Sequence, residues 1–124
     1  HTSQCPPAEL ELACVDAAPG EERWRDPMRW EIEFGGGPKR IGVCRGNLIH
    51  ADGAFLCLGE LGSLLWLDLS PQGCRVLSRA QPFIAAQTWT PPAISRGLLY
   101  VMQNSDDALG GAGPRVICYD LRGR

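Results

Sequence analysis

The residues that could do chemistry are few, and their spacing matches no common catalytic or metal site. The sequence contains two histidines, His1 and His50. Together they could hold Cu(II), because an amino-terminal amine and imidazole nitrogens suit that metal. However, His50 lies inside a strand-like run with nothing else that marks a site, and neither histidine is at ligand spacing from a cysteine pair. The sequence therefore predicts no metal site.

Nucleophiles and anion-binding loops give no stronger pattern. No serine lies in a Gly-x-Ser-x-Gly context, so no hydrolytic triad is expected. The segment 35–40, Gly-Gly-Gly-Pro-Lys-Arg, could bind an anion through its backbone N–H groups, but it lacks the Gly-x-x-x-x-Gly-Lys-Ser/Thr spacing of a phosphate loop. We interpret it as a loop between structural units, and we expect Glu60, next to a turn, to be solvated. No catalytic residue is predicted.

The cysteines allow two interpretations. The sequence has six of them, Cys5, Cys14, Cys44, Cys57, Cys74 and Cys118. That number in a short chain suggests a disulfide framework, as in a small secreted disulfide-stabilised β module. Cys14, Cys57 and Cys118, however, lie in apolar runs, where a free thiol acts as a small hydrophobe. We favour core thiols, and the possibility of one or more disulfides stays open.

Composition excludes several classes of protein. The 12 Lys and Arg residues against 14 Asp and Glu give a net charge of −2, so bulk electrostatics favour neither nucleic acid nor an anionic membrane as partner. The 44% hydrophobic share is typical of a chain that buries a core. No uncharged apolar run approaches the roughly 18–20 residues of a membrane-spanning helix. We therefore expect a globular protein without a membrane span and without a nucleic-acid partner.

Apolar runs separated by turn residues predict an all-β protein. Strands are expected over 11–16, 22–26, 40–50, 54–60, 63–69, 74–80, 88–95, 98–103 and 115–121. No segment combines a 3.6-residue apolar period with helix caps, so no helix is predicted. The runs 64–67 and 98–102 are continuously apolar, which indicates strands that are buried on both faces.

Three of these runs repeat one pattern, an apolar stretch that ends in Asp and is followed by Gly. The repeated residues are Asp16 with Gly20, Asp68 with Gly73, and Asp120 with Gly123. The aspartates are 52 residues apart, twice. The segments 51–58 and 95–102 are offset by 44 residues, and we place the difference in 105–114, as a lengthened hairpin loop. A period of about 40–50 residues with four short strands is typical of a β-propeller blade.

These repeated residues have structural roles on physical grounds. An Asp at a strand end accepts hydrogen bonds from the N–H groups of the turn, and Gly supplies the positive φ that such a turn often needs. Trp24 offers an apolar face whose burial between units contributes about 2–3 kcal/mol. Arg45 and Asn47 precede a strand and could face a central channel where a ligand binds, or could form a solvated strand end. They are the weak binding candidates.

The repeat resembles the pyrroloquinoline-quinone (PQQ)-like β-propeller repeat, whose blade motif is Ala-x-Asp-x-x-x-Gly-x-x-x-Trp. Asp16, Gly20 and Trp24 keep that spacing, with Cys14 in place of Ala. In the middle unit the Gly comes one residue later, and Leu77 or a neighbour stands where Trp would be; the last unit stops before a Trp could occur. In this family the Trp packs flat against the next blade.

The resemblance implies β-propeller blades of four-stranded antiparallel sheets, about 2.5 blades of a larger ring. The expected units are a blade remnant over 11–39, a complete blade over 40–87 and a partial blade over 88–124. The family includes quinoprotein alcohol dehydrogenases and a non-enzymatic lipoprotein of the bacterial outer-membrane assembly machinery. This similarity implies C-terminal blades of a bacterial protein in the periplasm or another extracytoplasmic compartment.

We therefore expect a non-catalytic scaffold for protein or ligand binding, a fragment of a larger PQQ-like repeat protein. Its partners would be the other blades of the parent propeller and a possible protein partner. The alternative is part of a PQQ-dependent quinoprotein oxidoreductase, but this sequence has no adjacent cysteine pair of the kind those enzymes use. No cofactor is expected, and PQQ would belong only to a complete parent protein. Because closed propellers have about 4–8 blades, open sheet faces and association are expected.

Overall fold

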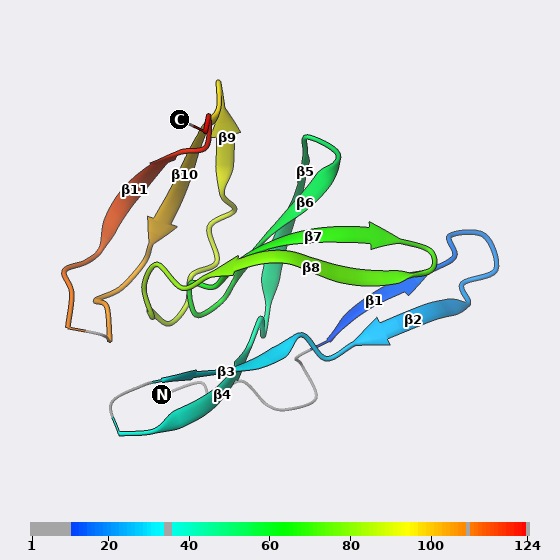
Figure 1. The fold of residues 1–124 in the computed structure, drawn as a ribbon, viewed down its shortest axis with the longest axis horizontal. Helices are drawn as coiled ribbons and strands as arrows, with labels where there is room; N and C mark the ends of the chain where they lie inside the picture. The colour runs from blue at the N-terminus through cyan, green and yellow to red at the C-terminus, as the bar shows by residue number, and fades with distance from the viewer. Residues whose placement is uncertain (1–10, 34–35, 109, 124) are drawn as a thin grey trace.

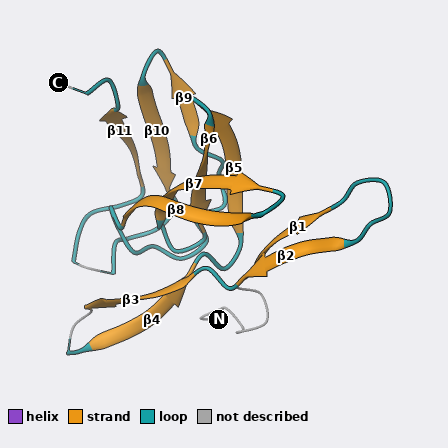
Figure 2. Ribbon diagram, turned by 45° about the vertical axis from the view of Figure 1, so that its right-hand side comes forward, coloured by secondary structure: helices purple, strands orange, loops and turns teal. Residues whose placement is uncertain are grey.

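The computed structural model describes residues 11–33, 36–108 and 110–123. Every regular element in these ranges is a β-strand, which confirms the all-β prediction (Figures 1 and 2). The strands are β1 (Leu12–Val15), β2 (Glu22–Asp26), β3 (Arg29–Glu33), β4 (Pro38–Gly42), β5 (Gly46–Ala51), β6 (Ala54–Gly59), β7 (Leu64–Ser70), β8 (Gly73–Ala80), β9 (Ala93–Ser95), β10 (Leu98–Gln103) and β11 (Arg115–Asp120).

The strands form four small antiparallel sheets, with strands that follow one another in the chain pairing as neighbours. The sheets are β1-β2, β3-β4, β5-β6-β7-β8 and β9-β10-β11. Figure 1 shows the four-stranded sheet between the other sheets. The described part of the chain closes into neither a barrel nor a propeller. The propeller therefore stays a prediction, and the coarser all-β architecture is what the structure establishes.

Two predicted strands are wrong in their extent. The predicted strand 40–50 is two strands, β4 and β5, which belong to different sheets. The chain breaks between them at Cys44, whose φ of 59° is incompatible with an extended strand. The predicted strand 88–95 shortens to β9, since Pro91 and Pro92 have no N–H to donate to a neighbouring strand.

The β3 strand was not predicted, although its sequence carries the signal. Arg29-Trp30-Glu31-Ile32-Glu33 alternates charged and apolar residues, the period of a half-buried strand. Trp30 and Ile32 point into the molecule, and β3 pairs with β4. The resulting hairpin spans residue 40, where the predicted first and second units meet.

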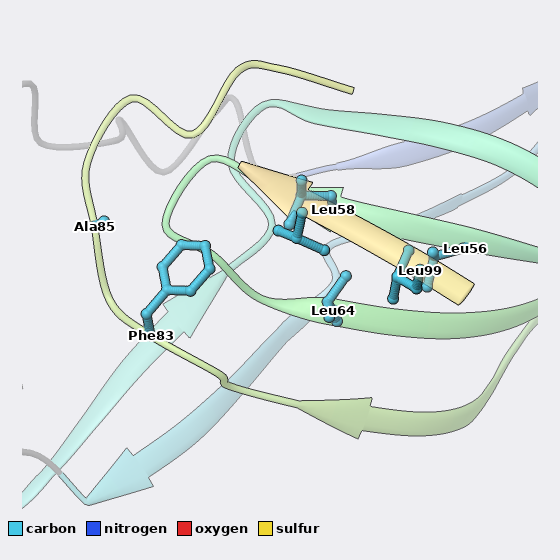
Figure 3. Close-up of a cluster of buried hydrophobic side chains, with 7 residues drawn as sticks. Leu56, Leu58, Leu64, Phe83, Ala85 and Leu99 are labelled. Atoms are coloured by element: carbon cyan, nitrogen blue, oxygen red, sulfur yellow. The ribbon is translucent and has the colours of Figure 1, made fainter. Parts of the chain in front are cut away.

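The four-stranded sheet is apolar on both faces, as the continuous run 64–67 predicted. One face carries a cluster that joins this sheet to β10 and to the loop after β8; its buried members are Leu56, Leu58, Leu64, Phe83, Ala85, Leu99 and Val101 (Figure 3). The opposite face carries a second cluster, which it shares with β3 and the segment before it: Met28, Trp30, Cys57, Leu65 and Leu67. The four-stranded sheet is therefore the centre of the core.

The prediction that both faces of 98–102 are buried is wrong. Leu99 and Val101 point into the first cluster, but Tyr100, between them, is 38% exposed. Side chains alternate across a strand, so β10 has one covered face and one open face. Among the described residues, no second sheet covers that open face.

Candidate functional site

Each of the three repeated aspartates lies in a strand or directly after one and pairs with an arginine. Asp16 follows β1, and its Oδ2 accepts from Arg23 Nε at 2.6 Å. Asp68 lies in β7 and accepts from Arg75 Nη2 at 3.0 Å. Asp120 ends β11 and is bound by Arg122 in the same way. An arginine stands seven residues after both Asp16 and Asp68, a spacing that could have indicated these two pairs.

Only one of these carboxylates binds the backbone of its turn. The N–H of Arg122 donates to Asp120 Oδ1 at 3.0 Å, and the Arg122 hydrogen bonds hold the pKa of this exposed carboxyl below its ordinary value. At Asp16 the turn is closed by backbone groups instead, with the Gly20 N–H donating to the Asp16 carbonyl at 2.9 Å. These aspartates are structural ion-pair partners on the surface of the protein.

The repeated glycines do not share one backbone conformation. Gly20 and Gly123 have φ of 75° and 62°, which a side chain would strain. Gly73 does not have a positive φ, because it is the first residue of β8 and pairs with Ser70. The turn there consists of Pro71 and Gln72. The middle unit therefore builds its turn differently from the first.

Trp24 links two sheets. It lies in β2, and its indole Nε1 donates to the backbone carbonyl of Ser70, at the end of β7, at 2.7 Å. Trp24 also lines a cleft of about 370 Å³ together with residues of β1, with Leu48 and with Leu69. The β1-β2 hairpin is thus attached to the four-stranded sheet through this one aromatic side chain and the residues around it.

The β1-β2 and β7-β8 hairpins have a pairing irregularity at equivalent positions. Each has one irregularity in its pairing, directly after Cys14 in the first and after Trp66 in the second, and these positions are 52 residues apart. Cys14 faces Trp24, whereas Trp66 faces Ser78. Ser78 is therefore the neighbour of Leu77 that stands where the repeat has Trp. The tryptophan lies on the second strand of the first hairpin, β2, but on the first strand of the second hairpin, β7.

Arg45 and Asn47 come together in a small pocket. With Gly46 and Trp89 they line a hollow of about 240 Å³. Asn47 Nδ2 donates to the Trp89 carbonyl at 3.0 Å, and Arg45 Nη1 lies 4.0 Å from Glu60 Oε1. Trp89 and Glu60 are distant in sequence from Arg45 and Asn47, and no local sequence signal indicates them as partners. The pocket is too small for more than a short side chain or a small polar molecule.

The expectation that Glu60 is solvated is wrong. Its side chain is buried, and its backbone N–H donates to the carbonyls of Val43 and Arg45 at 3.1 and 2.7 Å. Thr88 in turn donates its N–H to the Glu60 carbonyl. The turn after β6 is covered by the segment before β5 and by the loop after β8, which no local sequence signal indicates. Glu60 therefore supports the walls of the pocket from within the protein.

Both a disulfide and free thiols occur among the described cysteines. Cys44 is disulfide-bonded. Cys14, Cys57, Cys74 and Cys118 are free thiols, and Cys5 lies outside the described residues. Cys57 is only 4% exposed, in the cluster with Leu65 and Leu67. The core-thiol prediction is confirmed for Cys57, whereas Cys118 is exposed on the open face of β11.

We expect Cys57 to lower the stability of the protein at alkaline pH. Burial raises the pKa of this thiol from its ordinary value of 9.0 to about 12. Between these values the unfolded chain holds fewer protons than the folded chain, so the free energy of unfolding decreases as the pH rises from about 9 to about 12. Urea unfolding at a series of pH values measures this slope. Cys57→Val should flatten it, and Cys118→Ser should not; equal slopes in the parent and in Cys57→Val would contradict the assignment.

No metal centre or membrane helix emerges from the described residues. Within 11–33, 36–108 and 110–123, no group of three or more His, Cys, Asp or Glu could hold a metal ion. His50 packs its ring against Phe55 with centroids 4.9 Å apart, and His1 and Gly35 lie outside the described residues. In the described part of the chain, no helix has the length and apolarity to cross a membrane.

Comparison with known proteins finds no match for this chain among family models, curated proteins or solved structures. Its fold and candidate sites define an all-β protein of small antiparallel sheets that contact one another through apolar side chains.

Proposed function

We propose that this chain is a non-catalytic binding scaffold, a segment of a larger PQQ-like β-propeller protein. The pairing irregularity at equivalent positions of the β1-β2 and β7-β8 hairpins, directly after Cys14 and after Trp66, supports a repeated unit. The pairs β5-β6 and β9-β10 occupy equivalent places in the two larger sheets, and a longer loop joins β10 to β11 than β6 to β7. In the proposed propeller the four-stranded sheet belongs to the complete blade and the three-stranded sheet to the partial blade.

The observation that carries the binding role is the open face of the β9-β10-β11 sheet. Tyr100 pairs with Cys118 and Met102 pairs with Val116, so these four side chains share one face. Tyr100 is 38% exposed and Val116 is 65% exposed. An exposed apolar sheet face of this kind is typical of an interaction surface. Its proposed partner is a further sheet, from the parent propeller or from another protein.

The edge of the same sheet supports this proposal. The four-stranded sheet ends with β8, but in the three-stranded sheet β11 is the last strand among the described residues. An edge strand offers unpaired N–H and C=O groups to which another strand can add. The disulfide at Cys44 agrees with an oxidising, extracytoplasmic compartment, which the resemblance implies.

The proposed scaffold is expected to associate through the open face. Sedimentation of the full chain at increasing concentration should show oligomers, and a hydrophobic dye should bind. Combining Tyr100→Glu with Val116→Lys should give a monomer with at least about threefold less bound dye, since two charges then interrupt the apolar face.

The matched control for this experiment is Leu77→Lys. Leu77 is 50% exposed on β8, so this variant adds a charge at an equally exposed apolar position away from the open face. It should leave association unchanged. A sharp monomer of the parent chain at all concentrations, without dye binding, would exclude the proposed binding face.

A further inference from the structure

A cleft lies between the β7-β8 hairpin and the three-stranded sheet. Its volume is about 510 Å³, within the range of small-molecule sites. Its walls are mainly apolar and include Leu56, Leu64, Trp66, Leu99 and Tyr119, with Ser78 on the β8 side. Figure 3 shows Leu56, Leu64 and Leu99 lying together, from β6, β7 and β10. This cleft is on the face of β10 opposite to Tyr100.

In the preceding pair of sheets the corresponding cleft, of about 370 Å³, has an indole ring in its wall. There Trp24 projects from β2 and donates to the Ser70 carbonyl of the next sheet. Trp24 pairs with Cys14, and Ser78 pairs with Trp66 at the equivalent place in the next hairpin. The second pair of sheets therefore has the hydroxymethyl group of a serine where the first has an indole. Trp66 stands in the place of Cys14 and forms one wall of the cleft, but it does not fill it. The second pair of sheets therefore lacks the indole that the first pair has, and the cleft lies next to the position of that missing ring.

The charged and polar side chains at the cleft already interact with other groups of the protein. Asp120 is held by Arg122 through two side-chain hydrogen bonds. Arg79 places its guanidinium over the Trp30 ring, 4.9 Å from the centroid. Gln81 donates to the carbonyls of Leu61 and Phe83. A charged ligand would therefore lose hydration without gaining a matching partner, which favours a neutral one.

We propose that this cleft binds a small neutral aromatic molecule of the indole class. Its ring would lie beside Ser78, between Trp66 on one sheet and Tyr119 on the other. Aromatic rings gain from offset or edge-to-face contact with such neighbours in addition to the area they bury. The site is separate from the open face of the proposed scaffold, so either proposal can fail without the other.

Indole itself is the probe for this site. We expect it to bind the full chain with a dissociation constant of about 1 mM or tighter, a value typical of a small ligand with few atoms. Methyl NMR should show shifts at Leu56, Leu64 and Leu99 and none at Val116, which lies on the other face of the three-stranded sheet. Indole-3-acetate, which carries a charge, should bind at least about tenfold more weakly.

Ser78→Trp tests the location of the site. The new indole should occupy the part of the cleft beside residue 78, weaken indole binding at least about tenfold and raise the melting temperature. Ser78→Phe, with a smaller ring, is the second variant should the first one fail to fold. Leu77→Trp adds an indole at the adjacent exposed position and should leave binding unchanged. Absence of binding by the parent chain, shifts that spare all three leucines, or undiminished binding by a folded Ser78 variant would overturn the proposal.

Discussion

Phe83→Ala is expected to lower the free energy of unfolding by about 3–5 kcal/mol, as large-to-small changes of buried aromatics do. Phe83 is fully buried, in the cluster that joins the four-stranded sheet to β10. Figure 3 shows its ring between the loop after β8 and the strands that carry Leu58 and Leu64. Its removal leaves a cavity where two sheets and a loop meet, and the surrounding strands are hydrogen-bonded and cannot collapse into it. Urea unfolding of the full chain measures the loss.

Two further variants test whether the loss of stability comes from the packing around Phe83 and not from the removal of any apolar side chain. Leu77→Ala removes a half-exposed side chain and should change stability by no more than about 0.5 kcal/mol. Gly62→Ala tests the contact from the other side, because a Cβ there would lie 2.5 Å from the Phe83 ring and 2.7 Å from the Phe83 carbonyl oxygen. Gly62 also has a φ of 95°, so alanine is strained there even without a neighbour.

The two changes should therefore be coupled. In a Phe83→Ala background, Gly62→Ala loses the clash with the ring but keeps the clash with the carbonyl and the backbone strain. Its cost should become smaller without vanishing. Equal costs in both backgrounds, or a loss below about 1 kcal/mol for Phe83→Ala alone, would contradict the packing described here.

The sequence predicts the strands well where the local signal and the tertiary contacts agree. The run 64–67 is apolar at every position, and both faces of β7 are covered. The run 98–102 is also continuously apolar, but β10 lies in a sheet with one covered face. Local composition reports that a strand can be buried on both sides. It does not report whether a second layer is present, because that layer comes from distant residues.

The site was predictable in part, for a related reason. The 52-residue period correctly equates Cys14 with Trp66, which hold the same place in their hairpins. It does not find Ser78, because Trp24 follows Cys14 by 10 residues and Ser78 follows Trp66 by 12. The β7-β8 hairpin is longer and shifts the return strand relative to the period. Only the pairing of the two strands shows which residue takes the place of the indole.

Trp24→Ala is expected to release the β1-β2 hairpin from the four-stranded sheet. The indole is partly buried, so its removal should cost about 2–3 kcal/mol of apolar burial, and the hydrogen bond to Ser70 contributes about 1 kcal/mol more. Few other residues join this hairpin to the rest of the protein. The loss should therefore be local, since regions with few tertiary contacts open independently of the core.

Native-state hydrogen exchange distinguishes a local from a global effect. In Trp24→Ala, the amides of β1 and β2 should exchange at least about tenfold faster, while those of β6 and β7 keep their protection. Trp24→Phe keeps much of the apolar contact but has no N–H for the Ser70 carbonyl, so it should give an intermediate rate. Trp89→Ala removes an exposed indole and should change neither set of amides. Unchanged exchange in β1 and β2 of Trp24→Ala would show that Trp24 does not hold the two sheets together.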